Sequence, residues 1–115
     1  MNNFDFYSGM SAIEFLRDVG KNFRVGTMLS RDSVKSRMEV EGGEGLSFTE
    51  FSYQVLQAYD FLTLNRTKNT RIQIGGSDQW GNIASGIDLV RRVNQSSDLG
   101  SKEVYGVTLP LLVDS

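Results

Sequence analysis

Three polar side chains fall on one face of a helix expected between residues 47 and 64. At about 100° per residue, Tyr53, Gln57 and Asp60 lie within an arc of about 60°. A phenol, an amide and a carboxylate in a row can together hold an ammonium group and accept a proton from a hydroxyl. The alternative interpretation is an ordinary polar helix face in contact with solvent, and both interpretations stay open on this pattern alone.

A glycine-rich stretch, GGSDQWGN over residues 75–82, is the second candidate for chemistry. Paired glycines let a backbone approach a ligand closely, because they carry no Cβ. Asp78 can accept two hydrogen bonds from ribose hydroxyls, Gln79 can both donate and accept, and Asn82 is a reasonable cap for a following helix. The alternative is a glycine turn in which Asp78 and Asn82 are only turn formers.

The elements that must position these residues alternate between helix and strand. The hydrophobic periodicity predicts helices over residues 11–23, 30–38, 47–64 and 83–93, and strands over residues 70–74 and 104–113. This order is typical of a parallel α/β sheet, in which ligands bind at the carboxyl ends of the strands. The glycine-rich stretch directly follows the first predicted strand, so it occupies that place.

Local signals fix the ends and the buried faces of these helices. Ser11 is expected to cap the first helix, and Ser47 and Glu50 fit a capping box that opens the third. Residues at helical spacing predict the buried stripes: Ile13, Leu16, Val19 and Phe23 in the first helix, Phe51, Val55, Ala58 and Leu62 in the third, and Ile83, Ile87 and Val90 in the last.

Composition excludes several classes of protein. The 115 residues include no cysteine and no histidine, which excludes disulfides, thiolate metal sites and histidine-dependent triads within this chain. The net charge of −2 argues against a dedicated nucleic-acid-binding module. No apolar run approaches the roughly 20 residues that span a bilayer, so no membrane partner is expected.

Two long segments carry a resemblance to a known family. SFTEFSYQVLQAYDF (47–61) and IQIGGSDQWGNI (72–83) resemble the substrate-site motifs of bacterial and mitochondrial tyrosyl-tRNA synthetases, and the flanks FLRDVGK (15–21), SRDSVKSRM (30–38) and VTLPLL (107–112) agree. The resemblance implies an α/β fold, the Rossmann-like parallel sheet of a class I aminoacyl-tRNA synthetase catalytic domain. That sheet is expected to be incomplete in this chain.

The same resemblance implies a tyrosine-binding site. Tyr53 and Gln57 would hold the amino group of L-tyrosine, and Asp60 would accept a hydrogen bond from its phenolic hydroxyl. Gln79 would hold the tyrosyl end of the adenylate. Phenylalanine in such a site would leave a buried carboxylate without its hydrogen-bond partner. A merely apolar pocket could not impose this energetic cost on phenylalanine.

The resemblance also implies ATP as a substrate, with Mg²⁺ accompanying it and no bound prosthetic group. Gly76 and Asp78 would contact the adenosine ribose, and no residue of this chain is expected to act as a general acid or base. The family's histidine-containing and lysine-rich ATP signatures are both missing from the sequence. We therefore expect the central part of the catalytic domain, inactive as an isolated chain.

The family further implies tRNA(Tyr) as a partner and a homodimer. Residues 1–46 would form a connecting helical region near the dimer interface, and residues 47–115 the second half of the nucleotide-binding fold. Phe48 is a candidate dimer contact, with packing in the core as the alternative. Residues 23–33 (FRVGTMLSRDS) look closer to the mitochondrial branch, which predicts the mitochondrial matrix, or the cytoplasm if the protein is bacterial. An alternative function is the non-catalytic RNA-binding or intron-splicing role of some fungal mitochondrial members.

Overall fold

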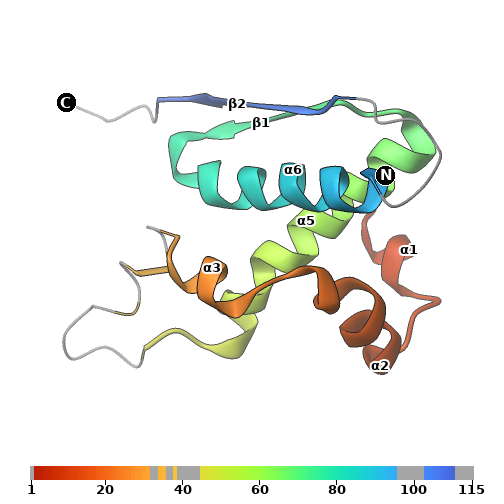
Figure 1. The fold of residues 1–115 in the computed structure, drawn as a ribbon, viewed down its shortest axis with the longest axis horizontal. Helices are drawn as coiled ribbons and strands as arrows, with labels where there is room; N and C mark the ends of the chain where they lie inside the picture. Colours follow the sequence, from red (N-terminus) through yellow and green to blue (C-terminus); the bar gives the residue numbers. More distant parts are fainter. Residues whose placement is uncertain (1, 32–33, 36–37, 39–44, 96–102, 111–115) are drawn as a thin grey trace.

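A pair of parallel strands and two long helices form the body of the protein. In the computed structural model, β1 (Ile72–Gly76) pairs with β2 (Tyr105–Leu109), and α6 (Trp80–Gln95) connects them in sequence. Figure 1 shows α6 running along one face of the strand pair, with α5 (Phe48–Lys68) crossing on its other side. The structure describes residues 2–31, 34–35, 38, 45–95 and 103–110.

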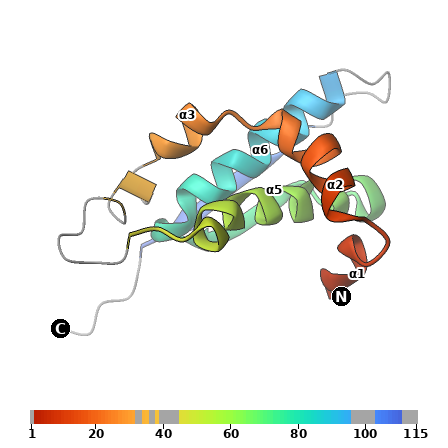
Figure 2. The ribbon, with the colours of Figure 1, turned by 90° about the horizontal axis from the view of Figure 1, so that it is seen from below.

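Short helices precede α5 and lie against it and α6, as Figure 2 shows. They are α1 (Phe4–Tyr7), α2 (Ala12–Glu14), the π-helical turn η1 (Phe15–Val19), the 3-10 turn η2 (Gly20–Asn22) and α3 (Val25–Leu29). The predicted cap at Ser11 is confirmed, because its Oγ accepts a hydrogen bond of 3.0 Å from the Glu14 amide.

The predicted buried stripe of the first helix is partly wrong. Val19 is buried, but Ile13 and Leu16 are exposed. The reason is the π-helical turn at Phe15–Val19. With i→i+5 bonding the chain rotates less per residue about the helix axis than in an α-helix, so different positions share a face. The helix predicted over 30–38 is confirmed in part: Val34, Lys35 and Met38 are helical, Ser30 ends α3, and residues 32–33 and 36–37 lie outside the described residues.

Helix α5 is longer than its periodicity predicted. Ser47 Oγ accepts a hydrogen bond of 3.1 Å from the Glu50 amide, which confirms the serine half of the capping box. The helix continues four residues past Leu64 and ends where Asn69 adopts the left-handed conformation at φ 57°. Asparagine tolerates that conformation, and its amide bonds to the Leu64 carbonyl, so the local chemistry of Asn69 sets the end of α5.

Replacing Ser47 by alanine should destabilise the protein by about 1 kcal/mol, because the Glu50 amide loses its capping acceptor. Thermal unfolding followed by circular dichroism measures the effect. Thr49→Ala is the matched control, since Thr49 is exposed inside α5 and alanine favours helix. Equal melting temperatures for Ser47→Ala and the parent would contradict the cap.

The core lies where α5 meets α6 and the segment before β2. The predicted faces are confirmed: Val55, Ala58 and Leu62 are buried in α5 with Phe51 half-buried, and Ile83 and Val90 are buried in α6 with Ile87 half-buried. The main cluster comprises Ala58, Phe61, Leu62, Leu89, Val90 and Val104. A smaller cluster of Val19, Met28 and Val55 joins the N-terminal helices to α5.

The two strands run parallel with Ile72 opposite Tyr105 and Gly76 opposite Leu109. Both strands start later than predicted, and β2 ends at Leu109, next to Pro110. Two glycines, Gly75 and Gly106, lie against α6, and a Cβ on Gly75 would come within 3.2 Å of the Ile83 Cδ1 atom. The opposite face leaves five apolar residues exposed: Ile72, Ile74, Tyr105, Val107 and Leu109. Among the described residues, no helix is long and apolar enough to cross a lipid bilayer.

Candidate functional site

A cavity of about 350 Å³ opens beside α5, where the chain enters β1. Tyr53, Gln57 and Asp60 all line it, so the structure gathers the predicted polar row at one hollow. Its volume falls within the range of about 300–1,000 Å³ typical of small-molecule sites. The other lining residues are Asn3, Leu56, Phe61, Leu64, Thr70, Ile72 and Gln73.

The Asp60 carboxylate receives two hydrogen bonds from the start of the chain. Asn3 Nδ2 donates to Oδ2 at 3.0 Å, and the Tyr7 hydroxyl donates to Oδ1 at 2.7 Å. The same hydroxyl lies 2.8 Å from the Leu56 carbonyl oxygen. Sequence reasoning missed Asn3 and Tyr7, because each lies more than fifty positions from Asp60 and shares no periodic pattern with α5.

Burial raises the pKa of the Tyr7 phenol well above its ordinary value of 10.0, and the hydrogen bond to Asp60 raises it further. The phenol therefore stays protonated at neutral pH and acts as a donor to the carboxylate. A second, more open cavity of about 410 Å³ shares Asn3, Asp60 and Leu64 with the first. Asp60 thus stands where the two hollows meet.

Asn82 links two of the predicted site residues. Its Nδ2 donates to Gln57 Oε1 at 3.1 Å and to Gln79 Oε1 at 3.2 Å. The prediction that Asn82 caps a helix beginning at Ile83 is wrong, because α6 already begins at Trp80 after the 3-10 turn η3 (Ser77–Gln79). The asparagine therefore sits inside the helix, where its amide fixes both glutamines instead of a helix end.

Gly76 ends β1, and Asp78 follows it in η3 with an exposed side chain. Both lie at the carboxyl end of a parallel strand, the place where open α/β sheets bind ligands. Among the described residues that line the 350 Å³ cavity, Gly76, Asp78 and Gln79 do not appear. The structure therefore connects Gln79 to the cavity through Asn82 and leaves Gly76 and Asp78 at the adjoining strand end.

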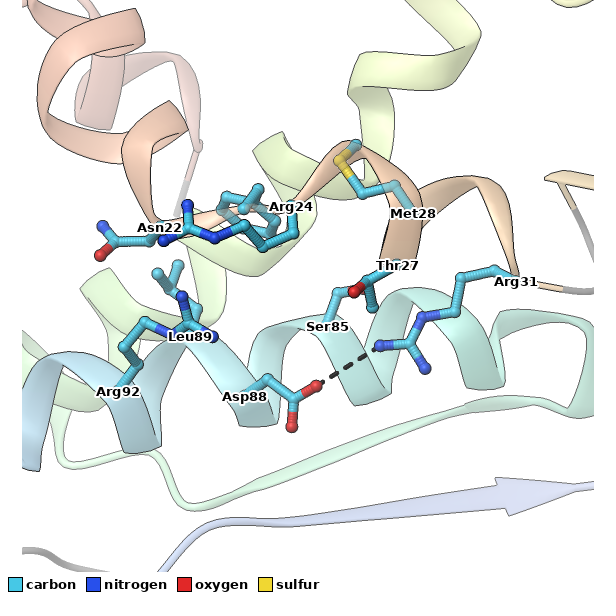
Figure 3. Close-up of a pocket in the computed structure, with 10 residues that line it drawn as sticks. Asn22, Arg24, Thr27, Met28, Arg31, Ser85, Asp88, Leu89 and Arg92 are labelled. Atoms are coloured by element: carbon cyan, nitrogen blue, oxygen red, sulfur yellow. Dashed lines mark hydrogen bonds and ion pairs between the residues drawn. The ribbon is translucent and has the colours of Figure 1, made fainter.

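A third hollow lies between the N-terminal segment and α6 (Figure 3). Arg24, Arg31 and Arg92 line it, and Arg31 forms an ion pair of 3.4 Å with Asp88. Its volume of about 50 Å³ holds a few water molecules and is far below that of a small-molecule site. None of the predicted site residues lines this hollow.

The comparison with known families identifies the fold around this site. The profile of the tRNA synthetases class I (W and Y) matches residues 1–115. The chain belongs to this family. The α/β fold predicted from the sequence, with the parallel strands of a class I synthetase catalytic domain, is thereby confirmed.

Within the class I synthetases, the individual relatives that the chain resembles are tyrosine–tRNA ligases. The chain is 58% identical over 115 residues to the tyrosine–tRNA ligase of Rhodopirellula baltica and 53% identical over 114 residues to that of Pectobacterium carotovorum. These matches include 100% and 99% of this chain, but only 24% and 25% of the two relatives' own lengths. The chain thus spans about a quarter of the length of the curated relatives it matches.

Solved structures agree with these matches. A C-terminally truncated mitochondrial tyrosyl-tRNA synthetase from Coccidioides posadasii superposes with a TM-score of 0.79 at 37% identity, over 97% of this chain and 33% of that one. The corresponding Aspergillus nidulans enzyme gives 0.77 at 36% identity. The predicted resemblance to tyrosyl-tRNA synthetases of the bacterial and mitochondrial type is confirmed.

Proposed function

We propose that the protein carrying this chain is a tyrosine–tRNA ligase, which activates L-tyrosine with ATP and transfers it to tRNA(Tyr). The observation that carries the proposal is the cavity that Tyr53, Gln57 and Asp60 line together, in a class I synthetase chain. Identities of 53–58% to bacterial tyrosine–tRNA ligases support the same substrate.

Each of the predicted tyrosine-binding residues has a role in this proposal. Tyr53 and Gln57 hold the ammonium group of tyrosine, with Gln57 oriented by Asn82. Asp60 accepts a hydrogen bond from the substrate phenol through a lone pair not used by Asn3 or Tyr7. Gln79 holds the tyrosyl end of the adenylate, since Asn82 ties it to Gln57.

The nucleotide belongs at the carboxyl end of β1. Gly76 and Asp78 contact the adenosine ribose there, and ATP enters as its Mg²⁺ complex. A carboxylate oxygen of tyrosine attacks the α-phosphorus, and the bond from that phosphorus to the bridging oxygen breaks to release pyrophosphate. No proton moves in this step, so positioning of the two substrates and stabilisation of charge supply the rate.

We also propose a homodimer with residues 1–46 near its interface, while residues 47–115 form the second half of the nucleotide-binding fold. Phe48 is 77% exposed, which favours a subunit contact over the alternative of core packing. The protein works where translation takes place. That place is the mitochondrial matrix, as the segment 23–33 indicates and the fungal mitochondrial structures support, with the bacterial cytoplasm as the alternative that the bacterial relatives support.

Amino-acid-dependent exchange of pyrophosphate into ATP tests this proposal directly. With the complete gene product, L-tyrosine should support exchange, whereas L-phenylalanine should support at least about 100-fold less at equal concentration. Phenylalanine offers no donor to the acceptor positions of Asp60 that Asn3 and Tyr7 do not use. L-Tryptophan is the necessary comparison, since the family includes enzymes for both amino acids. Exchange driven best by tryptophan, or by no amino acid, would refute the proposed function.

A further inference from the structure

The hydroxyl of Tyr7 hydrogen-bonds to the Asp60 carboxylate from outside the 350 Å³ cavity. The residues lining the 350 Å³ cavity and its 410 Å³ neighbour include Asn3 and Asp60, but Tyr7 lines neither of them in the described structure. Its ring packs edge-on against Phe15 at 6.0 Å and beside Tyr59 at 5.5 Å. Tyr7 therefore cannot fill the place of a ligand, although its phenol bonds to the same carboxylate.

One phenolic proton stands between two acceptors, the Leu56 carbonyl at 2.8 Å and Asp60 Oδ1 at 2.7 Å. The Leu56 carbonyl lies inside α5, where the helix ladder already supplies it with a donor. An ionised carboxylate is the stronger acceptor. The proton of Tyr7 therefore goes chiefly to Asp60.

The remaining capacity of Asp60 is what a ligand can use. Each carboxylate oxygen offers two acceptor positions. Asn3 takes one on Oδ2 and Tyr7 takes one on Oδ1. These two donors hold the plane of the carboxylate, and among the described residues the structure gives no donor to the second position on either oxygen.

We propose that Tyr7 is a positioning residue for amino-acid selectivity, which holds Asp60 so that an open acceptor position faces the phenol of the bound substrate. This inference rests on the proposed function. Loss of the Tyr7 hydroxyl leaves Asn3 as the only protein donor that the structure gives this carboxylate among its described residues. The carboxylate then turns more freely, which weakens only ligands that use it. Tyrosine uses it and phenylalanine does not.

The test compares Tyr7→Phe with Tyr59→Phe in the complete gene product. Tyr7→Phe keeps the ring that packs on Phe15 and removes only the donor to Asp60. Tyr59→Phe removes a phenolic oxygen from the neighbouring ring and leaves the bond between Tyr7 and Asp60 in place. Pyrophosphate exchange gives kcat and KM for L-tyrosine and L-phenylalanine in each variant.

Tyr7→Phe should lower kcat/KM for tyrosine by about three- to tenfold, chiefly through KM, and leave the value for phenylalanine within about twofold. Tyr59→Phe should change neither value by more than about twofold. Equal losses for both amino acids would mark a merely structural role and overturn the inference, as would an unchanged selectivity ratio. If the unsubstituted protein shows no tyrosine-dependent exchange, the proposed function itself fails, and that result is seen before any variant is made.

Discussion

Replacing Asp60 by asparagine is expected to lower kcat/KM for L-tyrosine by about 100-fold and to leave the value for L-phenylalanine nearly unchanged. A hydrogen bond to a charged group contributes about 1.5–3 kcal/mol, and the upper end of that range corresponds to about 100-fold. The amide also has only one oxygen, whereas the carboxylate receives donors on both, from Asn3 and from Tyr7. The substitution therefore removes the charge and breaks the arrangement that orients it. Pyrophosphate exchange with both amino acids measures the result.

Asp88→Asn is the matched control for this experiment. Asp88 also lies on a long helix and also has a polar partner, Arg31, but the Asp88 side chain is 64% exposed and lines the 50 Å³ hollow. Asp88 does not line the 350 Å³ cavity, so kcat/KM for tyrosine should stay within about threefold of the parent. A parallel loss for tyrosine and phenylalanine in Asp60→Asn would mean that Asp60 supports the fold and does not read the phenol.

The part of the site that lies on one helix could be predicted from the sequence. Helical geometry alone puts Tyr53, Gln57 and Asp60 on one side of α5, and the structure places all three at one cavity. The donors to Asp60 could not be found in this way. Asn3 directly precedes α1 and Tyr7 is its last residue, and a contact over 57 or 53 positions depends on tertiary packing that no local pattern encodes.

The preference of single residues for helix caps also gave a wrong prediction at the start of α6. Asn82 fits the preference of asparagine for helix caps, but the helix starts earlier because η3 leads directly into Trp80. Its amide is then free to bridge Gln57 and Gln79, which are 22 positions apart. At the end of α5 the residue preference was right and the periodicity was not. Asparagine favours the left-handed conformation that Asn69 adopts, but the spacing of apolar residues does not indicate where this helix ends.

The second substitution with a large expected effect is at Gly106, the glycine of β2 that faces α6. Replacing Gly106 by alanine should lower the free energy of unfolding by about 2 kcal/mol, the usual cost of overpacking a core. The added Cβ would overlap Cγ2 of Ile83 and lie 3.2 Å from Cδ1 of Ile87. Ile83 is 1% exposed and cannot move aside, so α6 and the strand must separate.

Gly26→Ala is the control for Gly106→Ala, because nothing lies within 4 Å of a Cβ at that position and alanine favours the helix in which Gly26 lies. Thermal unfolding should show a lower melting temperature for Gly106→Ala only. The separation of α6 from β2 should also weaken tyrosine binding, since α6 carries the Asn82 amide that holds Gln57 at the cavity. Parental stability in Gly106→Ala would mean that α6 does not pack on the strands as closely as described. Lost stability with full tyrosine affinity would mean that the packing of α6 on the strands does not determine the geometry of the site.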